Sequence, residues 1–442
     1  MLFTMCFWIL VVLVLVIGTV FLSRFLHQRE AAQAARRAAM LTPRIAQDPQ
    51  RGRPRPWIIA NPSKHASTED YEHFKEQVNA TAAELGIPHV HWLDTSVEDP
   101  GTGQAIRALK LGASVVIAAG GDGTVRAVAA GLAGSAVRMG IIPVGTGNLL
   151  ARNLALPIDD VPAAVRVALG PDHRMLDIGW VRVDEVEDEA ELPPEGRLVL
   201  QAREREGLDN QGTEGGEGAA SQRTQPEDLP QPDEYSFVVI SGIGFDGETM
   251  AHTDADLKKK VGWLAYVVSG ISSMTSDQMH VRLTMQSPHE SHPDWYSHPD
   301  VLPPNTDTSA SVSTISGDED EVTTELTARS VMFANCGELP FITLAPDAQL
   351  DDGLIDVIAV DIEAGLLGWA DLSRKLVSQG MGLKAENDGF STGKIAFRQA
   401  RLASVSVDEP QVVQVDGDAI GTARTVSARI QGHALDIAVP AP

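Results

Sequence analysis

Short apolar runs alternate with longer amphipathic stretches in the first half of the chain. The apolar runs cover residues 57–60, 114–119 and 139–142, and turn-forming residues follow each of them. Between the runs, residues 68–85 and 103–111 have the spacing of helices, and a further strand is expected near residues 89–93. Strands that alternate with helices form parallel sheets. Residues 56–170 are therefore predicted to form a doubly wound α/β domain.

The pattern changes after Met175, where helical spacing becomes rare. A series of short, β-prone runs follows, and consecutive short strands of this kind favour an antiparallel sandwich or barrel. Residues 171–442 are therefore predicted to form a second, antiparallel β-sandwich domain. The runs cover residues 181–183, 237–240, 280–285, 330–335, 354–360, 394–397, 403–407, 411–415 and 434–439.

The first residues of the chain are of a different kind. Residues 1–23 carry no charge, and their apolar stretch is as long as the roughly 20 residues that a membrane-spanning helix needs. Arginines follow directly at positions 24, 29, 36 and 37, and positive charge favours the cytoplasmic side. The sequence thus predicts a single-pass anchor (1–23) in the cell membrane, a basic Pro/Arg linker (24–55) and cytoplasmic catalytic domains. An interfacial or buried helix is the alternative.

Charge is distributed unevenly along the chain, whose formal net charge is −25. Residues 184–234 contain 16 acidic and 4 basic residues, and residues 287–325 contain 9 acidic residues and no basic one. Both segments are expected to be disordered inserts, because they contain too little apolar material to offset the entropy of ordering. Their acidity argues against a nucleic acid as partner. The two cysteines, Cys6 and Cys336, exclude a disulfide framework.

A glycine-rich turn, Gly120-Gly121-Asp122-Gly123-Thr124, follows the second apolar run. Its glycines let the backbone approach a phosphate closely, and the threonine can cap a helix expected over residues 125–132. A carboxylate beside a phosphate requires either Mg²⁺ or an acceptor hydroxyl that must lose its proton. The alternative is a glycine-rich turn with a capping aspartate.

Two other strand-to-turn junctions share this chemistry. One follows the third apolar run, and the other follows the first run, where Lys64 adds an ammonium group. All three junctions are expected at one edge of one sheet, which is where doubly wound folds bind ligands. The candidate nucleotide-binding residues at the junctions are Asn61, Ser63, Gly120, Gly121, Gly123, Thr124, Gly145, Thr146, Gly147 and Asn148.

This combination of motifs resembles the lipid kinases typified by bacterial diacylglycerol kinases, which are related to sphingosine and ceramide kinases. The two glycine loops match the family pattern intact, and the first turn matches in part. Further matching segments cover residues 242–246, 344–356 and 416–418. The resemblance implies ATP and Mg²⁺ as cofactors, a membrane lipid as acceptor, and an active site between two domains. A homodimer is also considered.

Three departures from the family pattern stand near the expected site. Lys64-His65 replaces the usual Ser-Gly, Leu149 replaces the commoner Asp, and Asp418 replaces the more usual Glu. The resemblance implies that Asp418 is the base that deprotonates the acceptor, with Asp416 beside it and Asp122 as the competing candidate. Residues two apart in a strand share a face, so Asp416 and Asp418 could both face the active site. The alternative is a hairpin turn, for which Asp-Gly is a strong signal.

Relatives in this family also hold a structural Mg²⁺. The resemblance places it on the carboxylate of Asp352 and on backbone carbonyls, which by position belong to Gln349 and Leu354. Hard oxygen donors of this kind suit Mg²⁺.

Two other function classes stay open. An NAD kinase would share the turn at residues 120–124, but it would lack the loop at residues 143–148 and would not need a membrane anchor. A catalytically weak nucleotide-binding membrane protein could keep the fold and lose the base. Assays with separate lipid and NAD acceptors would distinguish these classes.

Overall fold

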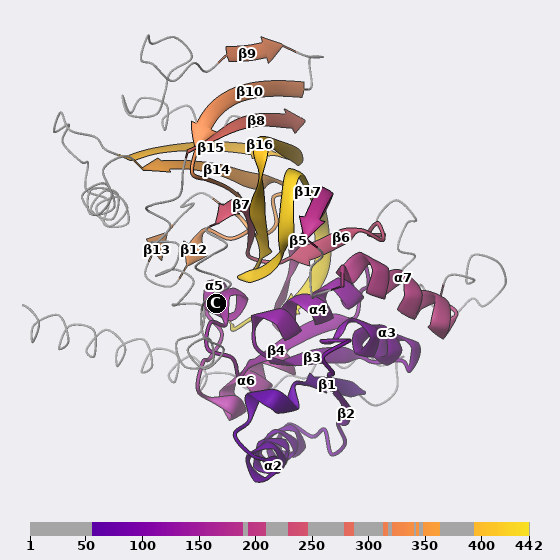
Figure 1. Ribbon diagram of the computed structural model, residues 1–442. Coiled ribbons are helices and arrows are strands. Elements are labelled where there is room, and N and C mark those ends of the chain that lie inside the picture. The colour runs from indigo at the N-terminus through magenta and orange to yellow at the C-terminus, as the bar shows by residue number, and fades with distance from the viewer. Residues whose placement is uncertain are drawn as a thin grey trace, which may run out of the picture.

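The computed structural model describes residues 55–188, 193–208, 229–245, 278–286, 313–316, 321–339, 342–343, 348–362 and 393–441. A large mixed sheet runs through these residues, and the helices gather around one end of it (Figure 1). The opposite end consists of strands alone in the part of the chain described.

The α/β end contains the parallel sheet that the sequence predicts. Its strands are β1 (Pro56–Ala60), β2 (His91–Asp94), β3 (Val115–Gly120) and β4 (Arg138–Pro143), in the order β4-β3-β1-β2. A short 3-10 helix, η1 (Pro62–Lys64), follows β1. The α-helices are α2 (Thr68–Glu84), α3 (Thr102–Lys110), α4 (Asp122–Leu132), α5 (Leu149–Asn153) and α6 (Val161–Ala168).

Both faces of β1, β3 and β4 are buried, which explains why these strands are continuous apolar runs. Successive side chains of a strand point to opposite faces. Ile58 and Ile117 belong to a cluster with Phe74 of α2, whereas Ile59 belongs to the cluster that contains Ile106 of α3. Helices therefore cover the sheet on both sides.

The described residues after α6 are mostly antiparallel strand, as the sequence predicts. The long strands β5 (His173–Asp188), β16 (Leu402–Val415) and β17 (Asp418–Ala438) lie at its centre. The other strands are β6 (Glu234–Phe237), β7 (Ile240–Phe245), β8 (Met279–Gln286), β9 (Ser313–Ser316), β10 (Glu321–Ala328), β11 (Ser330–Ala334), β12 (Glu338–Leu339), β13 (Ile342–Thr343), β14 (Ile355–Ile362) and β15 (Gly393–Ala400).

The end of β17 joins the two halves of the molecule. Ile437 pairs in parallel with Met139 of β4, while the same strand pairs antiparallel with β5. The sheet is consequently continuous from β15 to β2, in the order β15-β14-β11-β7-β16-β17-β4-β3-β1-β2. The separate β-sandwich predicted from the sequence is not confirmed, because the C-terminal strand returns to the α/β half.

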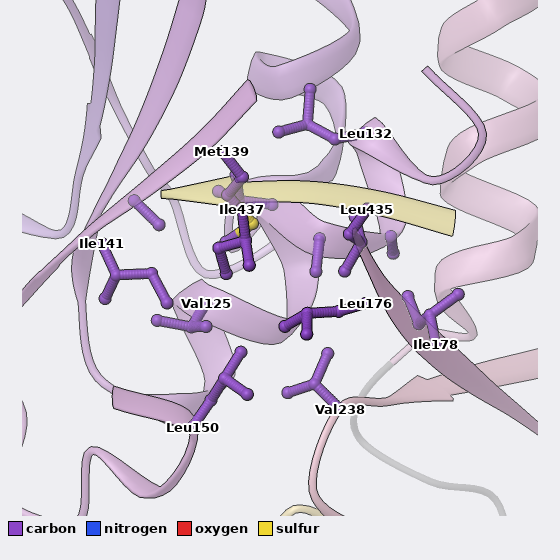
Figure 2. Close-up of a cluster of buried hydrophobic side chains, with 14 of the residues drawn as sticks. Val125, Leu132, Met139, Ile141, Leu150, Leu176, Ile178, Val238, Leu435 and Ile437 are labelled. Carbon is purple, nitrogen blue, oxygen red and sulfur yellow. The ribbon is translucent and has the colours of Figure 1, made fainter. Parts of the chain in front are cut away.

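Buried side chains from both halves meet at this junction. Figure 2 shows Val125 of α4 and Met139 of β4 with Leu176 of β5, Leu150 of α5 and Ile437 of β17. Each of these side chains is at most 5% exposed. Because α4 and α5 both contribute to the cluster, their first turns are held against the strands that carry the C-terminal half.

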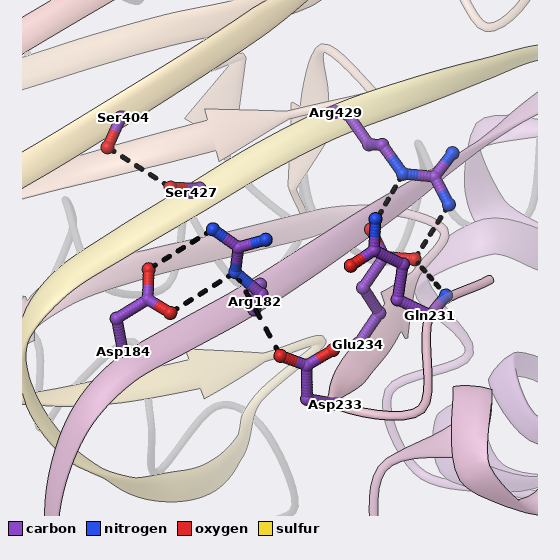
Figure 3. Close-up of polar contacts among 8 residues, drawn as sticks. All are labelled: Arg182, Asp184, Gln231, Asp233, Glu234, Ser404, Ser427 and Arg429. Carbon is purple, nitrogen blue, oxygen red and sulfur yellow. Dashed lines mark hydrogen bonds and ion pairs between the residues drawn. The ribbon is translucent and has the colours of Figure 1, made fainter.

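Beyond this core, one ion pair joins β17 to β6 and another lies within β5 (Figure 3). The guanidinium of Arg429 on β17 binds the carboxylate of Glu234 on β6 through two contacts of 2.6 and 2.7 Å. A second guanidinium, that of Arg182, binds Asp184 on the same strand, with a nitrogen–oxygen distance of 3.2 Å. Paired contacts of the first kind fix orientation as well as distance.

Parts of both acidic inserts are ordered, which corrects the prediction that they are disordered. The first insert contains the end of β5, the helix α7 (Glu195–Glu206) and the start of β6. The second contains β9 and the first residues of β10, which pairs with β8. In the first insert, burial of Glu195, Val199 and Ala202 orders α7 despite the acidic composition. Residues 189–192, 209–228, 287–312 and 317–320 of the inserts lie outside the described ranges.

The prediction of a single-pass membrane protein also needs correction. Within the ranges described above, no helix has the length and apolar character that crossing a bilayer requires. The predicted anchor, residues 1–23, and the predicted linker, residues 24–55, lie outside the described residues except for residue 55. We therefore do not retain the predicted localisation.

Candidate functional site

The three strand-to-turn junctions meet at the carboxyl ends of β1, β3 and β4. The N–H of Asn61 donates to the carbonyl of Ala119, and the N–H of Val144 donates to the carbonyl of Gly120, at 3.0 and 3.1 Å. A Cβ added at Gly145 would lie only 2.5 Å from Cα of Gly121. The two glycine loops are therefore in direct backbone contact, which a side chain at position 145 would prevent.

Gly120 and Thr124 are packed equally closely. A Cβ at Gly120 would lie 2.4 Å from Cβ of Thr124, whose side chain is 3% exposed. Helix α4 begins at Asp122 with Gly121 at its N-cap position, so Thr124 lies inside the first turn. The prediction that Thr124 caps this helix is thus wrong. Its hydroxyl lies 3.5 Å from Nδ2 of Asn61 and joins the first junction to the second.

The carboxylate of Asp122 points at the start of the next helix. Its two oxygens accept from the backbone N–H groups of Asn148 and Leu149, at 2.9 and 2.5 Å. Burial raises the pKa of Asp122, against the lowering effect of these two N–H donors. Asp122 thus connects the two glycine loops, and both of its oxygens already have donors.

Asn148 holds the second loop in shape. Its backbone is left-handed, with φ of 51°, and its side chain is 5% exposed. Oδ1 accepts from the N–H of Gly145 at 3.0 Å, and Nδ2 donates to the carbonyl of the same residue at 2.7 Å. The amide group of Asn148 is consequently occupied within the loop. Thr146 and Gly147 lie between Gly145 and Asn148 in the sequence.

The first junction adds a hydroxyl and a positive charge. Oδ1 of Asn61 accepts from both the N–H and the hydroxyl of Ser63, at 3.0 and 2.7 Å. The next residue, Lys64, extends over the glycine turn, where its Cε and Nζ lie 3.4 and 3.7 Å from the position of a Cβ at Gly121. Lys64, one of the departures from the family pattern, therefore places an ammonium group beside the glycine backbone.

Asp418, from the C-terminal part of the chain, lies beside the first glycine loop. It is the first residue of β17, and its Oδ2 lies 3.5 Å from the position of a Cβ at Gly123. The same oxygen is 3.2 Å from Nη2 of Arg126, and the Asp418 side chain is 40% exposed. The structure thus brings Asp122 and Asp418 together at the first turn of α4.

Asp416 lies on the other side of a tight turn. Asp416 and Gly417 have φ of 46° and 90° and connect β16 to β17, in which Val415 pairs with Asp418. The expectation that Asp416 and Asp418 share one face of a strand is therefore wrong, and the hairpin alternative describes the backbone. The Asp416 carboxylate turns inward and accepts from three backbone N–H groups, those of residues 238, 239 and 240, each at 2.9 Å.

Burial also controls the titration of Asp416. Desolvation raises its pKa to about 6, against the opposing effect of Arg126 and the three N–H donors. A buried carboxylate with this many donors from its own chain holds loops together. We therefore assign Asp416 a structural part in the site, not the catalytic one considered from the sequence.

The residues suggested for a structural Mg²⁺ surround a second turn. Oδ1 of Asp352 accepts from the N–H of Leu354 at 3.0 Å. Burial raises the pKa of Asp352, and the negative charges of Asp177 and Asp351 raise it further, whereas the N–H of Leu354 lowers it. Gln349 is exposed. Its carbonyl and that of Leu354 are hard oxygen donors that suit Mg²⁺.

No metal-binding group of three or more His, Cys, Asp or Glu side chains occurs within the described ranges. A magnesium ion that keeps several waters and binds one or two carboxylates needs no such group. The Asp352 site therefore stays a prediction.

Sequence reasoning missed two residues of the site, Arg126 and Glu195. Arg126 is 3% exposed although it belongs to the apolar stretch that forms α4, and Glu195 is 3% exposed although it lies in the acidic insert. A charged residue within a buried helix was the available signal for Arg126. No comparable signal marks Glu195, because its partner is 69 residues away in the chain.

Part of the chain is similar to known kinases. Residues 55–181 match the family model of the diacylglycerol kinase catalytic domain. A diacylglycerol kinase of Staphylococcus haemolyticus is 44% identical over 87 residues, which make up 19% of this chain and 26% of that enzyme. The resemblance inferred from the motifs is thereby confirmed, and it supports a kinase.

Two wider similarities extend beyond this region. An uncharacterized protein of Synechocystis sp. is 22% identical over 331 residues, which make up 74% of this chain and 55% of that protein. The chain thus spans about half the length of this relative. The crystal structure of a diacylglycerol kinase from Bacillus anthracis superposes with a TM-score of 0.52 at 18% identity, over 87% of this chain and 96% of that one. This likeness concerns the fold.

Proposed function

We propose that this relative of the diacylglycerol kinases is an ATP-dependent lipid kinase, which transfers the γ-phosphate to a lipid hydroxyl. Diacylglycerol, which would give phosphatidic acid, is the first acceptor to consider, and a sphingoid-type lipid is the second. The observation that carries the proposal is the meeting of two glycine loops with the Asp418 carboxylate at the first turn of α4.

The glycine loops suit the polyphosphate of ATP. Backbone N–H groups without side chains around them, at the start of an 11-residue helix, attract phosphate oxygens. Lys64 adds a positive charge directly beside Gly121, and an ammonium group stabilises phosphate as a point charge. These groups would hold the nucleotide and align its terminal phosphate. A bound Mg²⁺ would neutralise the charge that develops on the phosphate oxygens.

The base is better assigned to Asp418 than to Asp122. Both oxygens of Asp122 accept backbone N–H groups and fix the two loops. Asp418 is 40% exposed and binds Arg126 through one oxygen, so its other oxygen can receive a proton. Asp418 would take the proton from the lipid hydroxyl as that oxygen attacks the γ-phosphorus, while the bond between this phosphorus and the departing ADP oxygen breaks.

The decisive experiment measures the transfer of the labelled γ-phosphate of ATP to each of several acceptors. The purified full-length chain is incubated with γ-labelled ATP and, separately, with diacylglycerol, a sphingoid base and NAD, the lipids in detergent micelles. We expect label in a lipid product, and we expect the Asp418→Asn protein to lose it. Label in NADP would favour the NAD kinase alternative. Nucleotide binding without transfer to any acceptor would favour the catalytically weak nucleotide-binding protein.

A further inference from the structure

Arg126 is a buried cation at the centre of the candidate site. It lies one turn into α4, its side chain is 3% exposed, and three of its nitrogens have separate partners. Nε is 3.1 Å from Oε1 of Glu195, Nη1 donates to the carbonyl of Val415 at 2.7 Å, and Nη2 is 3.2 Å from Oδ2 of Asp418. One guanidinium thus connects α4, α7 and both strands of the hairpin.

We propose that Arg126 is a positioning residue, which holds the Asp418 carboxylate beside the glycine turn, and that Glu195 in turn holds Arg126. The proposal rests on the proposed function, because it assumes that Asp418 receives the acceptor proton. It assigns a part in the reaction to α7, a helix of the acidic insert.

The geometry leaves the guanidinium little freedom. A planar fork with a partner at each of three nitrogens cannot rotate without breaking contacts. Because Nη1 binds the residue before the turn and Nη2 binds the residue after it, the β16–β17 hairpin is fixed relative to α4. Asp418 is thereby kept 3.5 Å from the Cβ position of Gly123.

Glu195 is fixed as firmly as Arg126. Its Oε2 accepts from the N–H of Ser236 at 3.1 Å, so both of its oxygens are engaged. The neighbouring Gly196 lies against the backbone before β6, where an added Cβ would be 1.9 Å from the carbonyl oxygen of Gln231. The start of α7 is therefore locked against β6, and the Glu195 carboxylate has one position from which to hold Arg126.

A purely structural ion pair is the competing explanation, since a buried arginine requires a counter-ion in any case. Glu195 supplies a buried counter-ion at 3.1 Å, and the buried carboxylate of Asp416 adds a second negative charge near the guanidinium. Asp418 differs, since 40% of its side chain is exposed and water could solvate it. The contact between Arg126 and Asp418 is thus not needed to offset burial of the aspartate, and its consequence is orientation.

A double-mutant cycle tests the proposal. Arg126→Gln and Asp418→Asn are made singly and together, and kcat and KM for ATP are measured with the lipid acceptor. We expect Arg126→Gln to lower kcat by about 10- to 10²-fold, the usual cost of misplacing a reacting group, while KM for ATP changes little. Arg126→Lys, which keeps the charge but not the fork, should recover part of kcat. Arg166→Gln, at an exposed ion pair with Glu84, is the matched control and should leave kcat unchanged.

The combined variant separates positioning from structure. If Arg126 acts through Asp418, its substitution has little further effect once Asp418 is Asn. An equal loss of kcat in both backgrounds would overturn the proposal while leaving the lipid kinase assignment intact. Absence of transfer to any lipid by the wild-type chain would instead overturn the proposed function. A crystal structure of the Arg126→Gln or Arg126→Lys protein gives a readout independent of the acceptor, and an unmoved Asp418 carboxylate would also overturn the positioning role.

Discussion

The carboxylate of Asp122 accepts the backbone N–H of Asn148 at 2.9 Å, so the first residue of α4 caps the start of α5. The aspartate belongs to one glycine loop and the asparagine to the other. A carboxylate is favoured at a helix N-terminus, where N–H groups lack partners within the helix. This contact gives the aspartate in the middle of the glycine turn a structural part, which does not depend on the base that we propose at Asp418.

Replacing Asp122 by Asn should both weaken the fold and stop the reaction. An amide has one accepting oxygen, so its NH₂ group would face either the N–H of Asn148 or that of Leu149. We expect a loss of about 1–3 kcal/mol in the free energy of unfolding and a fall in kcat of about 10²-fold or more, because the two loops separate. Thermal unfolding and the labelled-ATP assay measure both. Activity within a few-fold of wild type would reduce Asp122 to a helix cap.

We expect substitution of Asp418 to affect the rate of the reaction more than the stability of the fold. Asp418→Asn removes the proton acceptor, so kcat should fall by roughly 10²-fold or more, the usual contribution of a positioned base, while ATP binding stays near normal. Asp418→Glu restores the commoner family residue and should retain much of the activity. A fully active Asp418→Asn protein together with an inactive Asp122→Asn protein would move the base to Asp122.

Lys64 should contribute mainly to nucleotide binding. Its Nζ lies 3.7 Å from the Cβ position of Gly121, and a hydrogen bond to a charged group contributes about 1.5–3 kcal/mol. Lys64→Met is therefore expected to raise KM for ATP by about 10-fold or more, with a smaller effect on KM for the lipid. Lys110→Met, at the exposed end of α3, is the control. Equal KM values for ATP in the two variants would show that Lys64 does not contribute to ATP binding.

The two contacting glycines should differ in their tolerance of a methyl group. A Cβ at Gly145 meets backbone, at 2.5 Å from Cα of Gly121, whereas a Cβ at Gly121 has its nearest contacts at 3.4 Å. Gly145→Ala should therefore abolish ATP binding, and Gly121→Ala should leave measurable binding. Titration with a fluorescent ATP analogue compares them. Equal affinities would show that the loops can separate without loss of the site.

The glycine loops were predictable from the sequence because local rules decide their structure. Apolar runs predict β1, β3 and β4, and turn chemistry predicts that the loops follow them, so the meeting of the three junctions follows from the parallel sheet. The convergence of Asp418 on this edge came only from the family resemblance. In the structure it depends on β17, which also pairs with β4 through Ile437 and Met139.

Amino-acid composition predicted less well which segments are ordered, because a few long-range contacts stabilise the acidic insert. The acidic insert has the composition of a disordered segment, yet Glu195 is buried against Arg126 and Gly196 allows close packing against the chain before β6. At Asp416-Gly417, by contrast, a local preference determines the structure. Spacing placed Asp416 and Asp418 on one face, but turn propensity decides the backbone there and directs the Asp416 carboxylate inward.

Asp416 makes a contribution to stability that depends on pH. Its pKa is raised from 3.8 to about 6 by burial, so the folded protein takes up a proton here at a higher pH than the unfolded chain does. A raised folded-state pKa stabilises the protein fully below the unfolded value, and this stabilisation is lost as pH rises through the folded value. The contribution of Asp416 should thus decrease by about 2 kcal/mol between pH 4 and pH 7.

The Asp416→Asn protein isolates this contribution, since an amide does not titrate. At pH 7 we expect the variant to be folded but less stable than wild type by about 1–3 kcal/mol, because one amide oxygen cannot accept from all three N–H groups. The deficit should grow as the pH falls from 7 to 4, since only the wild-type protein gains stability from protonation at this position. Urea unfolding at closely spaced pH values measures the difference, with Asp184→Asn, at a half-exposed ion pair, as the control. A deficit that is constant across this range would mean that Asp416 titrates at the same pH in the folded and unfolded chains, and that its N–H donors and Arg126 fully offset its burial.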